Sequence, residues 1–131
     1  PLARALARAL DPAPALILAP QAAGGHVDHV QLVRALRDVV PPGVPVLWWT
    51  DFPYSARPHS HPARPFAREM DRLPDHAIRG DDAARLHACA AYATQLGFQF
   101  GGEAGLRRAL DDAGPVERFR VTGRLPACLP A

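Results

Sequence analysis

The sequence predicts an α/β fold, a Rossmann-like three-layer sandwich with a mainly parallel sheet. Two short, wholly apolar runs at residues 15–19 and 44–49 have the composition of parallel strands that are covered on both faces. The segment between them, residues 28–39, repeats apolar side chains at helical spacing. A strand, a helix and a second strand in this order form a crossover unit whose strands are parallel. We expect the amino-terminal strands of the same sheet to be missing from this chain.

The first half of the chain has clear boundaries between its expected elements. Residues 1–10 place Leu and Arg at every fourth position, a pattern typical of an amphipathic surface helix, and the Pro-rich residues 11–14 end it. The helix over 28–39 ends at the Pro-Pro-Gly run of residues 41–43. Residues 55–79 then form a long Pro-rich connection with a weak helical patch at 66–73, and such connections are often binding loops.

The second half is expected to be mainly helical. Asp81 and its neighbours cap a helix over residues 83–96, whose inner stripe comprises Leu86, Cys89, Ala90, Ala93 and Leu96. Phe98 and Phe100 are expected to continue the packing beyond that helix. A short helix over 103–113 follows, Gly114-Pro115 breaks it, and the alternating residues 116–122 read as an edge strand before an irregular tail.

Composition limits the classes of protein to which the chain can belong. Its 131 residues fit one domain, residues 1–131, and a net charge of +2 argues against a nucleic-acid partner. Every basic residue is Arg, a bias of high-GC coding sequences, and no apolar run is long enough to span a membrane. Cys89 and Cys128 lack a disulfide or redox spacing, so a reducing, cytoplasmic setting is expected, with Cys89 as a core thiol. The chain opens at Pro1 inside a helical pattern, and we expect an amino-terminal segment or a second chain to complete it.

The run GGHVDH at residues 24–29 is the principal candidate for function. His26 and His29 lie three residues apart at a helix start, so both rings project to one side and can meet one ion or one substrate oxygen. Asp28 lies between them, close enough to hydrogen-bond a ring N–H. Gly24 and Gly25 let the backbone bend or a ligand approach. The alternative is that the two histidines are ordinary polar groups at the start of a helix.

The segment after the second predicted strand is expected to face the same crevice as the histidines. Parallel strands deliver their carboxyl ends to one sheet edge, where α/β proteins bind ligands, so the histidine loop and residues 50–54 meet there. Trp48 and Trp49 either stack on a sugar ring or are buried in the strand core. His59 and His61 are expected to be solvated rather than metal ligands.

Three motifs in order resemble the PIG-L or LmbE-like N-deacetylase superfamily. They are GHVDHxxVR at residues 25–34, DFPY at 51–54 and AYATQ at 91–95. The resemblance implies a zinc-dependent hydrolase, with another divalent metal as the alternative, that removes an N-acetyl group from a small N-acetylglucosaminyl-type substrate. It covers the carboxyl-terminal part of such a domain.

The resemblance also implies roles for individual residues. His29 would be a zinc ligand, and His26 would stabilise the oxyanion or protonate the departing amine with Asp28 as its orienting partner. Asp51, Tyr54, Trp49 and Gly25 would form the substrate side of the crevice. Tyr92 and Gln95 would buttress a late helix.

The departures from the family pattern concern the catalytic apparatus. The aromatic-acidic pattern that is usual before DFPY appears here as Trp48-Trp49-Thr50-Asp51, and Thr94 stands where a Ser or a related residue is usual. The family's first motif, Ala-His-Pro-Asp-Asp, is absent from these residues; it would supply two zinc ligands and the carboxylate that activates water. We therefore expect the catalyst to be incomplete in this chain. The alternatives are a sugar-binding α/β module without metal chemistry and a purely structural domain. An open sheet edge would favour a homo-oligomer.

Overall fold

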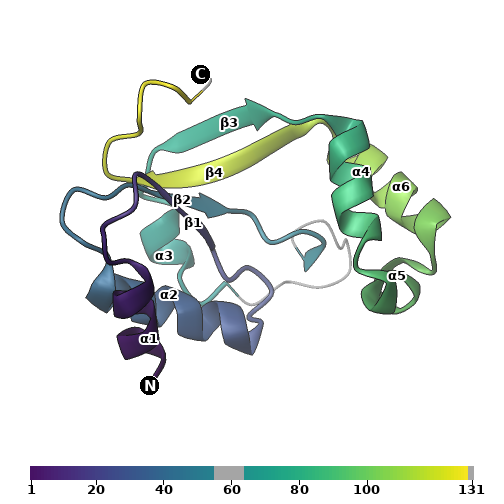
Figure 1. Ribbon diagram of the computed structural model, residues 1–131. Helices are drawn as coiled ribbons and strands as arrows, with labels where there is room; N and C mark the ends of the chain where they lie inside the picture. Colours follow the sequence, from purple (N-terminus) through teal and green to yellow (C-terminus); the bar gives the residue numbers. More distant parts are fainter. Residues whose placement is uncertain (55–63, 130–131) are drawn as a thin grey trace. The chain divides into compact units, whose positions relative to one another are not determined.

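The computed structural model describes residues 1–54 and 64–129. In that part of the chain, six helices accompany one four-stranded sheet (Figure 1). The strands are β1 (Ile17–Pro20), β2 (Val46–Trp49), β3 (Asp75–Arg79) and β4 (Val116–Thr122). The helices are α1 (Leu2–Ala9), α2 (Val27–Val39), α3 (Ala67–Met70), α4 (Asp82–Ala90), α5 (Ala93–Phe100) and α6 (Glu103–Ala113). The α/β class is confirmed.

The sheet is mixed, with the strand order β1-β2-β4-β3. Strands β1 and β2 are parallel, as the crossover through α2 requires, and β2 and β4 are antiparallel. Backbone hydrogen bonds from Val121 N–H to Pro74 C=O and from Gly80 N–H to Pro115 C=O show that β3 and β4 are antiparallel too. The expectation of a mainly parallel sheet thus holds only for β1 and β2. An alternating or apolar sequence pattern identifies a strand but carries no information about its direction.

One expectation about the burial of β1 and one about the position of β4 are wrong. Strand β1 lies at one edge of the described sheet, and its Leu18 side chain is 61% exposed, so its apolar run is not covered on both faces. Strand β4 was expected at an edge but lies between β2 and β3, with Phe119 and Val121 buried. Its alternation reflects one apolar and one polar face, which an interior strand also shows.

The core lies where the crossover unit packs against the sheet. Val46 and Trp48 of β2 and Ile17 and Ala19 of β1 meet the apolar side of α2. The full cluster also contains Ala22, Val33, Leu36, Phe66 and Met70. Burial of each large side chain contributes about 1.5–3 kcal/mol. This packing holds the amino-terminal end of α2, and with it the histidine loop, against the carboxyl ends of β1 and β2.

Helix α3 is fixed to α2 by one arginine. The guanidinium of Arg37 lies 4.5 Å above the centre of the Phe66 ring, a cation–π contact, and it also forms an ion pair with Glu69. The weak helical patch predicted at 66–73 is this single turn. The connection predicted at 55–79 is shorter than expected, because its last residues form β3. The predictions for residues 55–63, which include His59 and His61, lie outside the described residues.

The chain forms two compact units, residues 1–76 with 118–131 and residues 77–117, and the division falls inside β3 and β4. The second unit holds α4, α5 and α6. The single helix predicted over 83–96 is two helices, because the chain leaves helical geometry at Tyr92, whose ψ is 58°. Four residues of its expected inner stripe, all but Ala93, are half-buried, whereas Phe98 is 85% exposed. The buried apolar side chains of this unit are Leu106 and Leu110 of α6. Helical periodicity continues across a break of two residues, Ala91 and Tyr92, so the sequence pattern does not reveal the break.

Candidate functional site

His26 and His29 lie side by side at the start of α2. His26 is the N-cap residue, and its Nδ1 accepts a hydrogen bond of 3.3 Å from the backbone N–H of Asp28. The centres of the two imidazole rings are 5.1 Å apart. The expected projection to one side is therefore present. Since the Nδ1 of His26 accepts a hydrogen bond, the neutral ring carries its proton on Nε2 and can donate from there.

The carboxylate of Asp28 does not make the contact that the sequence suggested. It lies 3.8 Å from the Nδ1 of His26, beyond hydrogen-bond distance, and its side chain is 83% exposed. The backbone N–H of Asp28, not its carboxylate, orients the His26 ring.

Asp51 occupies the position behind the second histidine. Its side chain is the buried charged group of the described residues, and its Oδ1 pairs with the Nδ1 of His29. Its Oδ2 accepts a hydrogen bond of 2.9 Å from the backbone N–H of Ala23. Because a carboxylate only accepts, Nδ1 of His29 carries the proton and Nε2 is left with a lone pair. Burial raises the pKa of the Asp51 carboxyl, and the Ala23 N–H and His29 oppose that rise.

The glycines of the loop make room for Tyr54. Gly24 and Gly25 have φ values of 91° and 70°, which side-chain-bearing residues rarely adopt. A Cβ on Gly24 would lie 2.6 Å from the Cβ of Tyr54, so Tyr54 packs directly on the loop backbone. The Tyr54 ring lies 6.4 Å from the ring of His26. Three of the expected site positions, His26, Gly25 and Tyr54, thus lie in one small region.

The two tryptophans have different environments. Trp48 is buried in the core cluster, and its Nε1 donates a hydrogen bond of 2.8 Å to the Thr122 hydroxyl. Trp49 is half-buried at the end of β2, opposite Phe119 of β4. Burial in the strand core therefore applies to Trp48, and Trp49 is the one tryptophan with surface available for a ligand.

A crevice of about 320 Å³, here called the polar crevice, lies within the first unit. It borders the histidine site, because Ala23 lines it and Thr50 precedes Asp51. The lining residues are Gln21, Ala23, Thr50, Arg64, Asp75, Arg118 and Arg120. Sequence reasoning missed this crevice, because its arginines looked like a consequence of codon bias. The one available signal was the Arg at alternate positions of the predicted strand 116–122.

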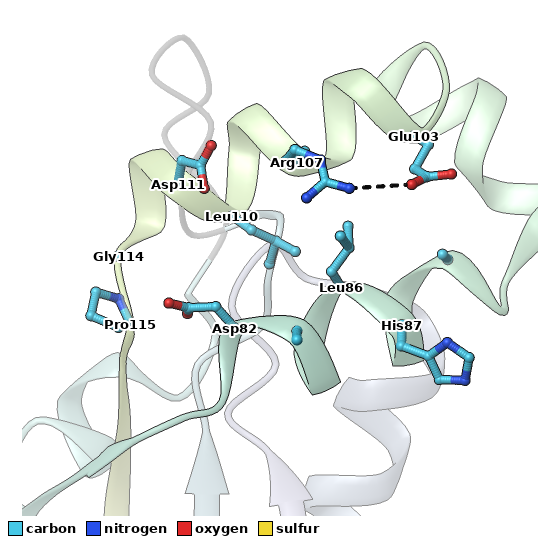
Figure 2. Close-up of a pocket in the computed structure, with 11 residues that line it drawn as sticks. Asp82, Leu86, His87, Glu103, Arg107, Leu110, Asp111, Gly114 and Pro115 are labelled. Carbon is cyan, nitrogen blue, oxygen red and sulfur yellow. Dashed lines mark hydrogen bonds and ion pairs between the residues drawn. The ribbon is translucent and has the colours of Figure 1, made fainter.

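The second unit contains a hollow of about 620 Å³ between α4 and α6 (Figure 2). Figure 2 shows Leu86 and Leu110 pointing toward each other there, with Arg107 paired to Glu103 at the rim. None of the residues that the sequence analysis proposed for catalysis, metal binding or substrate binding lines this hollow. Cys89 lies on α4, half-buried, and burial raises the pKa of its thiol.

Within the described residues, no group of three or more His, Cys, Asp or Glu side chains is arranged to hold a metal ion. Among the histidines that the structure describes, His29 has a carboxylate, that of Asp51, behind its ring and its Nε2 left available. None of the helices in this part of the chain has the length and apolar character needed to cross a membrane.

Comparison with known proteins points to deacetylases. No family model matches the chain. Over 42 residues it is 48% identical to the 2'-N-acetylparomamine deacetylase of Streptomyces fradiae, a match that covers 31% of this chain and 15% of that protein. The crystal structure of the A40926 pseudoaglycone deacetylase superposes with a TM-score of 0.60 and 27% identity over 92% of this chain and 55% of the other.

A second solved structure, a deacetylase from the biosynthesis pathway of teicoplanin, superposes with a TM-score of 0.65 over 92% of this chain and 51% of the other. At 20% identity it shows the similarity of fold alone. The chain thus has a deacetylase-like fold over nearly its whole described length and spans about half the length of these solved chains.

Proposed function

We propose that the chain is part of a zinc-dependent hydrolase that removes an N-acetyl group from an amino-sugar compound. The observation that carries the proposal is the pair formed by His29 and the buried Asp51. The similarity to deacetylases supports the reaction type. The resemblance of residues 25–34 and 51–54 to the PIG-L or LmbE-like motifs supports the same superfamily.

Among the described residues, His29 has the arrangement expected of one protein ligand in a zinc site. A histidine that binds zinc usually donates its other ring N–H to a carboxylate, which fixes the tautomer and the ring orientation. His29 has this arrangement, with Nδ1 on Asp51 and Nε2 available. A catalytic zinc takes three protein ligands, so the remaining ligands would come from residues outside those described. Another divalent metal that accepts imidazole would use the same nitrogen.

The bound metal would acidify a water molecule and polarise the acyl carbonyl. His26 would act beside it, because its Nε2–H is free of the Asp28 contact and its ring lies 5.1 Å from that of His29. That N–H can donate to the carbonyl oxygen as negative charge develops, or pass a proton to the departing amine. Asp28 would orient His26 through its backbone N–H. Gly25, Tyr54 and Trp49 would contact the substrate, whereas Asp51 would hold His29.

Metal content and amine release test the proposal together. The wild-type protein, assayed together with the segment that supplies the remaining metal ligands, is expected to carry zinc and to release amine from an N-acetylglucosaminyl substrate. His29→Ala should lose both, whereas His26→Ala should keep the metal and lose about 10²-fold in rate. His87→Ala, on the exposed side of α4, is the matched control and should change neither. Zinc content and rate unchanged in His29→Ala would exclude this histidine from the site.

A sugar-binding module without hydrolytic chemistry is the second candidate, and the half-buried position of Trp49 favours it. Under this reading the protein binds sugar equally well with and without a chelator and releases no amine. If the histidines only begin a helix, His29→Ala costs no more than about 1 kcal/mol of stability and changes no activity.

A further inference from the structure

The polar crevice contains more hydrogen-bond donors than its own acceptors use. Three guanidinium groups line it, and each presents five N–H donors. Arg64 donates to Asp71 at 2.6 Å, and Arg118 donates to Asp75 at 2.6 Å. These two carboxylates neutralise two of the three positive charges.

Arg120 is the third guanidinium, and its ion pairs with Asp71 and Asp75 are longer than those of Arg64 and Arg118. Its closest acceptor is the backbone carbonyl of Leu73 at 3.3 Å, and both Asp71 and Asp75 lie 3.9 Å away, beyond hydrogen-bond distance. Of the charges described here, three positive groups face two negative ones, so the crevice keeps one positive charge and unused N–H donors. A site of this kind favours an anionic, oxygen-rich ligand.

The position of the crevice connects it to the histidine site. The Ala23 N–H that holds Asp51 belongs to a lining residue, and Thr50 is the neighbour of Asp51 in the sequence. The Gln21 side chain donates to the Trp48 carbonyl at 2.9 Å, which fixes the crevice wall to the end of β2. The volume of about 320 Å³ exceeds the space that a small inorganic anion would fill.

We propose that the polar crevice binds a sugar ring that bears a carboxylate, with Arg120 as the main contact and Arg118 as the second. The inference rests on the proposed function, because it names the part of the substrate that lies beside the reacting N-acetyl group. The carboxylate accepts hydrogen bonds from the guanidinium groups, and the ring hydroxyls meet Gln21, Thr50 and Asp75.

Titrations with small probes test the crevice separately from hydrolysis. Glucuronate, glucose and inorganic phosphate are each added to the isotopically labelled protein, and amide chemical shifts are followed by NMR. Glucuronate should bind at least about tenfold more tightly than glucose and should shift the amides of Thr50 and Arg120. Phosphate should bind more weakly than glucuronate, because it leaves most of the crevice empty.

Two variants identify the contacts. Arg120→Gln should weaken glucuronate binding by about tenfold and leave glucose binding unchanged. Arg118→Gln, at a side chain that is 65% exposed, should show a smaller loss and keeps the test informative if Arg120→Gln does not fold. Arg124→Gln, on the exposed tail, is the control and should bind as the wild type does.

The outcomes separate this proposal from the zinc hydrolase. His29→Ala should keep its affinity for glucuronate even where it loses zinc and activity. Equal affinities for glucuronate and glucose, or wild-type affinity in both Arg120→Gln and Arg118→Gln, would overturn the crevice assignment and leave the role of His29 untouched. Phosphate binding that matches or exceeds glucuronate binding would also overturn it, in favour of a simple anion site.

Discussion

The Nδ1 of His29 pairs with a carboxylate oxygen of Asp51 whose side chain is wholly buried, although 22 residues separate the two in the sequence. The pair connects the first turn of α2 to the end of β2. The other oxygen of Asp51 holds the loop between them through the Ala23 N–H. One carboxylate therefore fixes both the orientation of the ring and the path of the histidine loop.

Replacement of Asp51 should affect both stability and metal binding. Asp51→Ala leaves the buried Ala23 N–H without its acceptor and His29 without its partner, so we expect a loss of about 1–3 kcal/mol in the free energy of unfolding. Loss of the carboxylate behind a histidine ligand should also lower zinc affinity by about 10–100-fold. Urea denaturation and competition with a zinc chelator measure the two effects.

Two further variants separate the effects. Asp51→Asn keeps the shape and an acceptor for Ala23, so it should be more stable than Asp51→Ala. Its amide cannot accept from His29 and from Ala23 equally well, so zinc affinity should fall in both variants. Asp28→Ala, at an 83% exposed side chain, should stay within about 0.5 kcal/mol of the wild type. Wild-type stability in Asp51→Ala would contradict the assigned role.

Gly24→Ala should be unusually destabilising for a loop substitution. It combines a φ of 91° with a Cβ that would lie 2.6 Å from that of Tyr54, so the loop or the tyrosine must move. The backbone conformation alone costs about 1–2 kcal/mol, and the clash should add to it. Thermal unfolding and urea denaturation measure the total.

Gly43 provides the matched control for this substitution. Its φ is 82°, but nothing lies within 4 Å of an added Cβ, so Gly43→Ala should show the backbone cost alone. Tyr54→Gly in the Gly24→Ala background removes the clashing Cβ together with the ring, and it should recover part of the difference between the two glycine variants. If Gly24→Ala costs no more than Gly43→Ala, the close packing of Tyr54 on the loop is wrong.

Helix boundaries and the histidine pair could be predicted from the sequence because they depend on local chemistry. Helix α6 and strand β4 have the predicted bounds, and α2 begins one residue before the predicted start. Periodicity defines such elements, and Pro or Gly ends them. The same local geometry places His26 and His29 on one side of the first turn.

The relationships between distant segments could not be predicted in this way. The partnership of His29 with Asp51 depends on how α2 packs on β2, so the sequence suggested the neighbouring Asp28 instead. The interior position of β4 depends on the order of strands, and strand order is set by contacts that no single pattern records. Arg118 and Arg120 likewise face a crevice only because β4 lies next to β2.

Cys89 should react more slowly with alkylating reagents than Cys128. Burial raises the pKa of the Cys89 thiol; the Arg85 charge opposes the rise, and the Glu117 charge adds to it. The thiolate is the reactive form, so at pH 8 the exposed Cys128 should be modified by iodoacetamide about tenfold faster. Mass spectrometry of the Cys89→Ser and Cys128→Ser variants measures each rate, and both rates should converge in urea.

The raised pKa of Cys89 also predicts a loss of stability at alkaline pH. Above the unperturbed value of 9.0 the unfolded chain ionises this thiol before the folded chain does, so the stability contribution present below that pH is lost as pH rises through the folded pKa. Cys89→Ser removes this ionisation. The difference in unfolding free energy between the wild type and Cys89→Ser should therefore narrow from pH 8 to pH 10. A difference that stays constant over this range would contradict the predicted contribution of the Cys89 thiol.

Alanine variants of the two tryptophans should separate the contribution of core packing to stability from the contribution of a ligand contact to binding. Trp48→Ala removes a buried side chain from the core and its hydrogen bond to Thr122, so it should cost about 3–5 kcal/mol in unfolding free energy. Trp49→Ala should cost less, because that side chain is half-buried, but it should weaken sugar binding by about tenfold if the ring contacts the ligand. Thr122→Val is the mild control for Trp48 and should cost about 1 kcal/mol. Sugar affinity is measured on the folded fraction of each variant. Weaker binding in Trp48→Ala together with wild-type binding in Trp49→Ala would contradict the predicted contact between Trp49 and the sugar.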